Sequence, residues 1–178
     1  MTPEKLKYPI GQFENPKEIT NTMFRDYISD ISTFPQRLRN DVLTLSDLQL
    51  NTTYRPEGWT IRQVISHCAD SHMNALVRLK LTLTEDKPTI KPYYEARWAE
   101  LPDSTNIPID SVLKMIEGIH ERWTVLLKSL TPKQMKLTFK HPEQGKEISI
   151  AENTALYAWH CNHHLAHITS LKNAKGWK

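Results

Sequence analysis

Hydrophobic residues recur every three or four positions in four separate stretches of the chain, a pattern that predicts amphipathic helices. The first stretch covers 15–34 and opens with Asn15 and Pro16, a favourable pair for a helix cap and first turn. Pro35 is expected to kink or interrupt this helix, which could then run on to about Leu43.

The other three stretches have clear signals at their ends. The second starts at Thr60 and the fourth at Ser149, and each has a Gln or Glu three residues later that completes a capping box. The third runs from about Asp110 to Leu130, and the fourth ends near Asn173. All three are long enough to cross a small domain.

The connections between these helices differ in kind. Residues 84–108 contain four prolines and predict a long irregular crossing, whereas 136–150 alternate like a short hairpin around a Pro/Gly turn. Four amphipathic helices joined in this way predict an all-α fold, an up-and-down four-helix bundle with one long crossover. We expect residues 1–178 to form a single domain of this kind.

Composition and charge narrow the class of protein. The 178 residues are 39% hydrophobic, and 23 basic against 20 acidic residues give a net charge of only +3. No basic stripe with interleaved aromatics favours a nucleic-acid partner, and no apolar run suggests a signal peptide or a membrane span. Cys68 and Cys161 are too few for a disulfide framework, so we expect a soluble cytoplasmic protein.

The stretch WHCNHHLAHITS, residues 159–170, contains four of the eight histidines. On a helix all four lie within about 60° of His160, on the side that should face the bundle interior. They are His160, His163, His164 and His167. Such a cluster is typical of a metal site, and the alternatives are a polar core network or a pH-responsive interface.

The spacing leaves the ligand set open. A helical pair four residues apart can hold a metal ion, and either His160 with His164 or His163 with His167 has that spacing. A bundle builds such sites from facing helices, so a third ligand should come from elsewhere. The candidates on the other helices are His67, His72 and His120.

His67 heads a polar stripe on the second helix, whereas His72 lies within an apolar one. The polar stripe consists of Ser71, Asn74 and Arg78. A polar wall is what a site would present, so the stripe favours His67. We interpret His72 and His120 as hydrogen-bonded core histidines, and Cys68 and Cys161 as small core residues.

A zincin-type protease is excluded by the residues that follow each histidine. That mechanism needs a Glu directly after the first His of the pair, to act as general base. Here Cys161 follows His160 and His164 follows His163.

The segments EGWTIRQVISHCADSHMNALVRLKLTLTEDKPTIKPY and YAWHCNHHLAHI resemble the DinB-like superfamily. Within it the chain is most similar to the YfiT-type metal-dependent hydrolases, a group that also includes bacillithiol transferases. The likeness extends from YPIGQF near the start through HPEQG to the last helix.

The resemblance implies an up-and-down four-helix bundle that holds one divalent metal ion per chain, zinc or nickel, through His67, His160 and His164. His163 and His167 would then be neighbours of the ligands. The resemblance also implies a homodimer.

Three imidazoles around a divalent ion leave an open position, as in catalytic zinc sites. The expected function is metal-dependent hydrolysis of a small-molecule substrate by metal-bound water. The alternatives are transfer of a low-molecular-weight thiol to an electrophile and a non-catalytic metal-binding bundle. Asp70 and Glu143 are candidate general bases, and Asn74, Arg78 and Tyr93 are candidate substrate contacts, but the sequence assigns no catalytic residue.

Overall fold

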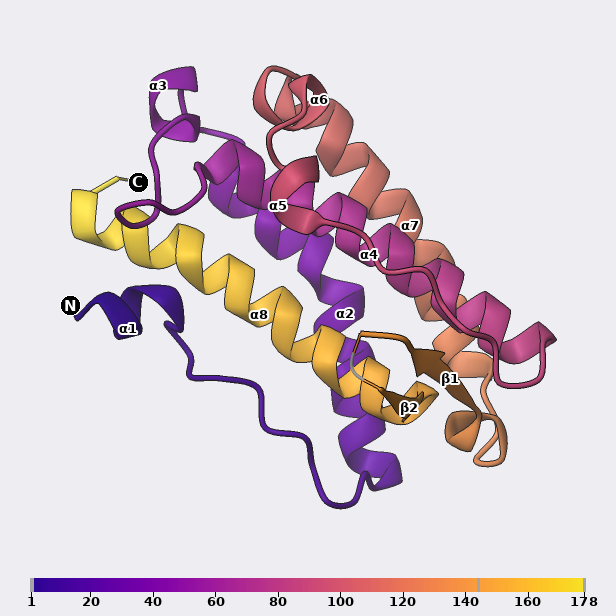
Figure 1. Cartoon of the computed structure of the whole chain (residues 1–178). Helices are drawn as coiled ribbons and strands as arrows, with labels where there is room; N and C mark the ends of the chain where they lie inside the picture. Colours follow the sequence, from indigo (N-terminus) through magenta and orange to yellow (C-terminus); the bar gives the residue numbers. More distant parts are fainter. Residues whose placement is uncertain (1, 144, 178) are drawn as a thin grey trace.

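The structure, a computed structural model, describes residues 2–143 and 145–177, and four long helices form its frame (Figure 1). These helices are α2 (Asn21–Val42), α4 (Ile61–Thr84), α7 (Ile109–Ser129) and α8 (Ile150–Lys175). The shorter elements are α1 (Pro3–Lys7), α3 (Asp47–Leu50), α5 (Glu95–Trp98), α6 (Pro102–Thr105), a 3-10 turn η1 (Gln134–Lys136) and the hairpin of β1 (Thr138–His141) and β2 (Lys146–Ser149).

The capping signals of α4 and α8 act as the sequence predicts. Thr60 caps α4 and Ser149 caps α8, each within a complete capping box. Gly176 ends α8 with a left-handed φ of 65°, a conformation that glycine adopts without steric cost. The two helices that carry the candidate ligands are therefore fixed at their ends by their own sequence.

The first long helix begins later than the sequence suggested. Thr20 caps α2, and its hydroxyl accepts a hydrogen bond from the Met23 backbone N–H. Asn15, the expected cap, instead donates its side-chain amide to Glu152 at the start of α8, at 2.9 Å. The helix continues through Pro35, so the proline lies inside it rather than ending it.

The crossover makes α4 and α7 run parallel. At the start of α4, Arg62 donates to the Ile107 carbonyl oxygen just before α7, at 2.6 Å. In the middle of both helices, His72 contacts His120. The long segment after α4 thus returns the chain to the end where α4 began, which a strict up-and-down order does not include (Figure 1).

The helices α2 and α8 also run parallel. Asn162 donates to the Asp30 carboxylate, and further along both helices Lys172 donates to Asp41 at 3.2 Å. Each of these helices packs against its neighbours around the bundle in the order α2, α7, α4 and α8. The four-helix bundle, the long crossover and the hairpin are as expected, whereas the helix directions at the crossover differ from a simple alternation.

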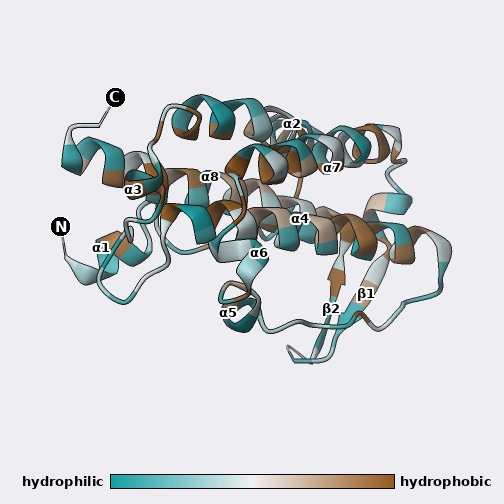
Figure 2. Ribbon diagram, turned by 90° about the horizontal axis from the view of Figure 1, so that it is seen from above, coloured by the Kyte–Doolittle hydropathy of each residue, from teal (hydrophilic) through white to brown (hydrophobic). Residues whose placement is uncertain are grey.

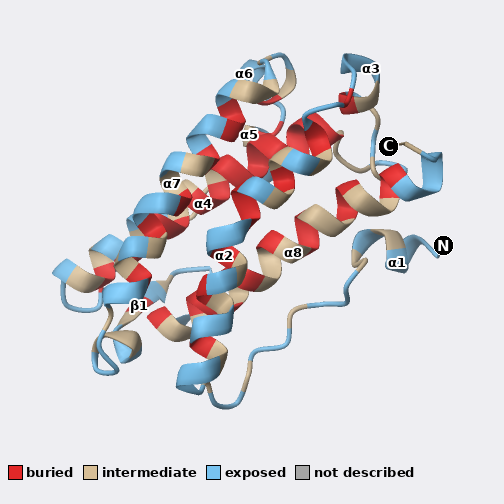
Figure 3. Ribbon diagram, turned by 180° about the vertical axis from the view of Figure 1, so that it is seen from behind, coloured by how far each residue is buried: buried red, intermediate tan, exposed pale blue. Residues whose placement is uncertain are grey.

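The core lies between the four helices. Hydrophobic and hydrophilic residues alternate along each long helix (Figure 2), and buried residues follow the sides that face the bundle interior (Figure 3). Ile31, Phe34, Ile65, Ile116 and Trp123 are almost completely buried there. Among the described residues, no helix is both long and apolar enough to cross a membrane.

A second, smaller cluster joins the crossover to the hairpin. It consists of Ile90, Phe139 and Ile148. Backbone hydrogen bonds reinforce it, since Ile90 donates to the Lys140 carbonyl at 3.1 Å and Lys140 donates to that of Pro88 at 2.8 Å. The crossover, which also forms the short helices α5 and α6, is thereby held against the hairpin.

The capping box of α8 gives a testable prediction. Ser149→Ala removes the hydroxyl that accepts the Glu152 N–H, so it should lower the free energy of unfolding by about 1 kcal/mol in guanidinium titrations. Ser129→Ala is the control, because that hydroxyl lies near the C-terminal end of α7 and caps no N-terminus. Equal stability of the two variants would contradict the prediction.

Candidate metal centre

His67 on α4 meets His160 and His164 on α8 where the two helices pack together. The Nε2 atoms of His67 and His160 are 3.2 Å apart. The His164 ring centroid lies 4.8 Å from that of His67 and 4.4 Å from that of His160. One ring nitrogen from each of the three lies within 4.8 Å of the others.

This spacing fits a shared metal ion. Two imidazole nitrogens bound to tetrahedral zinc, each about 2.0–2.1 Å from it, lie about 3.4 Å from each other. The 3.2 Å between His67 and His160 is close to that separation. Two ligands come from one turn of α8 and the third from a facing helix, the arrangement that helix bundles use for such sites.

The three histidines line a cavity of about 550 Å³. Four segments besides α4 and α8 contribute to its wall: the end of α1 with Tyr8, the 54–59 turn, the crossover at 92–95, and the hairpin. The crossover that the sequence left irregular therefore forms part of the cavity wall. The cavity is large enough for a small molecule beside an ion.

The other predicted site residues divide into two groups. Six of them line the cavity: Ser71, Arg78, Tyr93, Glu143, His163 and His167. Asn74 and Asp70 are not part of its lining; Asn74 donates to the Asp70 backbone carbonyl at 2.9 Å. Burial, and then repulsion from Asp103, raises the pKa of Asp70 to about 6.

Several cavity residues were not identified from the sequence. They are Lys7, Tyr8, Tyr54, Arg55, Trp59, Glu95, His141 and Tyr157. Tyr157 precedes His160 by three positions on α8, so helical spacing alone placed it on the same face. The others lie on turns and short elements, where no periodic pattern relates them to the histidines.

Arg78 is a cavity cation whose charge is not paired within the part of the chain that the structure describes. Its Nε atom is buried without a hydrogen-bond partner, and no carboxylate among the described residues forms an ion pair with it. Three cationic side chains line the cavity, Lys7, Arg55 and Arg78, against two acidic ones, Glu95 and Glu143. The cavity is therefore net positive even before an ion is added.

Burial keeps the clustered histidines neutral. It lowers the pKa of His67 to about 4, with His167 adding repulsion, and that of His163 to about 3. The pKa values of His160 and His164 lie well below the usual value for the same reason, and repulsion between the rings lowers them further. Neutral imidazole is the form that binds metal ions, so these rings are ready to act as ligands near pH 7.

Within residues 2–143 and 145–177, two further groups of side chains come close enough to hold an ion. In the first, His72, His120 and Cys161, the facing nitrogens of the two histidines are 2.8 Å apart and are used in a hydrogen bond. The second, His163, His164 and His167, comes from one helix, and the His167 Nε2 donates to the Lys7 carbonyl at 3.0 Å. The group of His67, His160 and His164 lines the cavity and joins two facing helices, whereas His72, His120 and Cys161 are not part of the cavity lining.

Comparison with known proteins identifies the family. The pattern of the DinB superfamily matches residues 31–168. This chain belongs to the DinB superfamily. The resemblance inferred from the sequence motifs is thereby confirmed.

Relatives in this superfamily match over almost the whole chain. A protein of Oceanobacillus iheyensis named "Putative metal-dependent hydrolase OB0782" is 55% identical over 171 residues, which cover 96% of this chain and 98% of the relative. A Bacillus cereus protein named "Putative metal-dependent hydrolase" is 50% identical over 172 residues, or 97% and 98% of the two chains.

A solved structure supports the fold. YfiT from Bacillus subtilis, described as "a probable metal-dependent hydrolase with an unusual four-helix bundle topology", superimposes with a TM-score of 0.95 at 42% identity. The match covers 98% of this chain and 99% of YfiT. The four-helix bundle of this DinB-superfamily protein is thus shared with a solved relative.

The buried histidines predict how stability depends on pH. Their pKa values are lower in the folded than in the unfolded chain, so the unfolded chain binds more protons below about pH 6.5. The stability of the metal-free protein should be complete above that pH and should fall as the pH drops towards 4, each such imidazole contributing up to about 1.4 kcal/mol per pH unit.

Guanidinium unfolding of the metal-free protein at pH 7.5, 6.5 and 5.5 measures this effect. His163→Phe removes one of these imidazoles while keeping a ring beside Trp159, so its stability should depend less steeply on pH. A wild-type stability that stays constant between pH 7.5 and 5.5 would contradict the prediction.

Proposed function

We propose that this protein is a divalent-metal-dependent hydrolase of small-molecule substrates, with zinc or nickel held by His67, His160 and His164. The observation that carries the proposal is the convergence of three neutral imidazoles on one edge of a cavity of about 550 Å³. The names of the relatives support the same reaction class. When bound, the ion would act as a Lewis acid towards the substrate and lower the pKa of a coordinated water.

The protein's own residues supply the surroundings for this chemistry. Tyr157 packs against His160 and donates its hydroxyl to the Ser71 carbonyl at 3.2 Å, so the wall beside the ligand is fixed. Tyr93 contributes to the cavity wall from the crossover. Glu95 and Glu143 are the carboxylates on the cavity wall that are available to accept a proton.

The charge of the cavity favours a second candidate function, transfer of a thiol to an electrophile. Three cationic side chains and a divalent ion would stabilise a thiolate, and an acidic group on a low-molecular-weight thiol would pair with Arg78. Cys68 and Cys161 cannot supply the thiol themselves, because both are buried and burial raises their pKa values.

Metal content tests the ligand set. Protein purified without a chelating column should carry about one divalent ion per chain, measured by plasma mass spectrometry. His67→Ala, His160→Ala and His164→Ala should each lose it, because two imidazoles no longer define the site. His141→Ala is the matched control, since His141 lines the same cavity outside the group of three.

Full metal occupancy in His67→Ala would overturn this ligand set. With the metal confirmed, a panel of esters and amides tests hydrolysis, and loss of an epoxide only in the presence of added thiol tests transfer. Metal binding without either activity would leave a non-catalytic metal-binding bundle.

Arg78 gives a prediction about substrate class. We expect it to bind an acidic group of the substrate, so Arg78→Met should weaken succinate binding to the zinc-loaded protein by about tenfold or more. Lys80→Met is the control, because Lys80 is exposed two residues further along α4 and does not line the cavity. Isothermal titration measures both, and equal affinities would show that Arg78 binds no acid.

The homodimer implied by the family resemblance and the cytoplasmic location expected from the composition belong to the same proposal. Sedimentation velocity of the metal-loaded protein tests the first, with a mass of about twice that of the chain as the expected result.

A further inference from the structure

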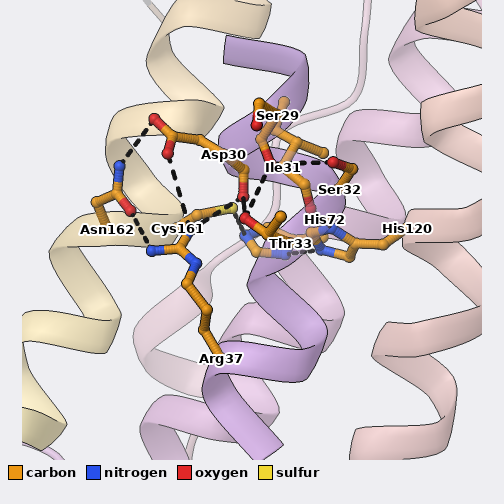
Figure 4. Close-up of polar contacts among 10 residues, drawn as sticks. All are labelled: Ser29, Asp30, Ile31, Ser32, Thr33, Arg37, His72, His120, Cys161 and Asn162. Atoms are coloured by element: carbon orange, nitrogen blue, oxygen red, sulfur yellow. Dashed lines mark hydrogen bonds and ion pairs between the residues drawn. The ribbon is translucent and has the colours of Figure 1, made fainter. Parts of the chain in front are cut away.

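Three histidines form a continuous chain of contacts that ends at the candidate ligand His160. The Nε2 atom of His72 lies 3.1 Å from the Nδ1 atom of His160, and the Nδ1 atom of His72 lies 2.8 Å from the Nε2 atom of His120. The other nitrogen of His120, Nδ1, lies 2.6 Å from the Ile31 carbonyl oxygen. Figure 4 shows Ile31, His72 and His120 side by side between their helices.

The Ile31 carbonyl is available because of Pro35. In a regular helix this carbonyl would accept the backbone N–H of the residue four positions later, and proline has none. Ile31 is completely buried, so water does not replace the missing donor. His120 on α7 does so instead.

A carbonyl oxygen can only accept a hydrogen bond, and this fixes which nitrogen of each imidazole in the row carries the proton. His120 must carry its proton on Nδ1, so its Nε2 accepts from the Nδ1–H of His72. The Nε2 of His72 then accepts from the Nδ1–H of His160. The Nε2 of His160 therefore carries no proton and keeps its lone pair. This is the atom that faces Nε2 of His67.

We infer that His72 and His120 are positioning residues that hold His160 with its proton on Nδ1 and its Nε2 lone pair directed into the metal site. This inference rests on the metal site proposed above. Neither residue touches the ion; each acts through the next ring. Carbonyl or carboxylate partners commonly orient metal-binding histidines, and here two further imidazoles carry that role to a distant carbonyl.

Apolar rings surround the two histidines and leave them little exposed to solvent. His72 is 0% and His120 is 1% exposed, and the rings of Phe34 and Trp123 pack against both. The thiol of Cys161 lies 3.9 Å from His72 Nε2 and stays protonated, because burial raises its pKa. Each link in this row of imidazoles is a direct contact between protein atoms.

A shorter chain of the same kind leads to His164. Its Nδ1 lies 3.4 Å from the Nδ1 of His167, and the Nε2 of His167 donates to the Lys7 carbonyl at 3.0 Å. The carbonyl again assigns the protons, so His164 also keeps Nδ1–H and presents Nε2 to the site. Both ligands on α8 are thus oriented by a carbonyl oxygen from another part of the chain.

Nitrogen-15 NMR of the metal-free wild type tests the assignment directly. The imidazole signals of His72, His120 and His160 should each show a protonated Nδ1 and an unprotonated Nε2 at pH 7.5. A predominant Nε2–H form at any of the three would overturn the inference. This measurement needs neither a variant nor a bound metal.

Metal affinity tests the consequence. His72→Leu removes the acceptor of His160 and should weaken zinc binding about 10- to 100-fold in competition with a chelator of known affinity. His120→Leu should weaken zinc binding less. His72 remains, but without His120 its proton is free to move to Nε2, the atom that accepts the hydrogen bond from His160. Phe34→Leu is the packing control: it removes a ring that contacts both histidines and breaks no hydrogen bond.

The outcomes separate this inference from the proposed function. Zinc affinity of His72→Leu equal to that of Phe34→Leu, with His160→Ala unable to bind, would refute the positioning role and leave the metal site intact. A wild type that binds no zinc would refute the proposed function, while the NMR signals would still decide the direction of the chain. If His72→Leu does not fold, His120→Leu and the wild-type spectra decide the question.

Discussion

The structure depends on a constraint that comes with burying neutral imidazoles next to one another. Each ring has one donor and one acceptor, and each buried nitrogen needs a partner. Burial lowers the pKa of His120 to about 4 and keeps His72 neutral as well, so the rings cannot gain partners by taking up extra protons. A row of such rings therefore has a direction, which is decided by whatever lies at its end.

The helix arrangement provides the path for this row. It leads from His160 on α8 to His72 on α4, then to His120 on α7 and to Ile31 on α2, so one hydrogen-bonded chain joins all four long helices. It requires α4 to pack against both α7 and α8, as it does here. The crossover, which sets α4 and α7 parallel, aligns the middles of these helices and at the same time forms part of the cavity wall.

The sequence predicted the features of the fold and the site that depend on local patterns of residues. Capping boxes located α4 and α8, and helical spacing placed the histidines of α8 on one face and distinguished His67 from His72. It could not predict what depends on contacts between distant segments. Asn15 has the sequence context of a helix cap, but its side chain donates a hydrogen bond to Glu152. No local sequence pattern indicates that the crossover makes α4 and α7 parallel. The contact between His72 and His120 follows only once the order of helices around the bundle is known, so both residues read simply as core histidines.

Pro35 shows how an apparent defect can support the site. A proline inside a helix costs about 3 kcal/mol or more, and a buried carbonyl left without a donor would add about 1–3 kcal/mol. The hydrogen bond from His120 removes that second cost, so the two irregularities, a free carbonyl on α2 and a buried histidine on α7, satisfy each other. Because the carbonyl carries no proton, the chain of imidazoles that starts there cannot reverse. Its unpaired nitrogen must therefore emerge at His160, on the side of the cavity where His67 and His164 converge.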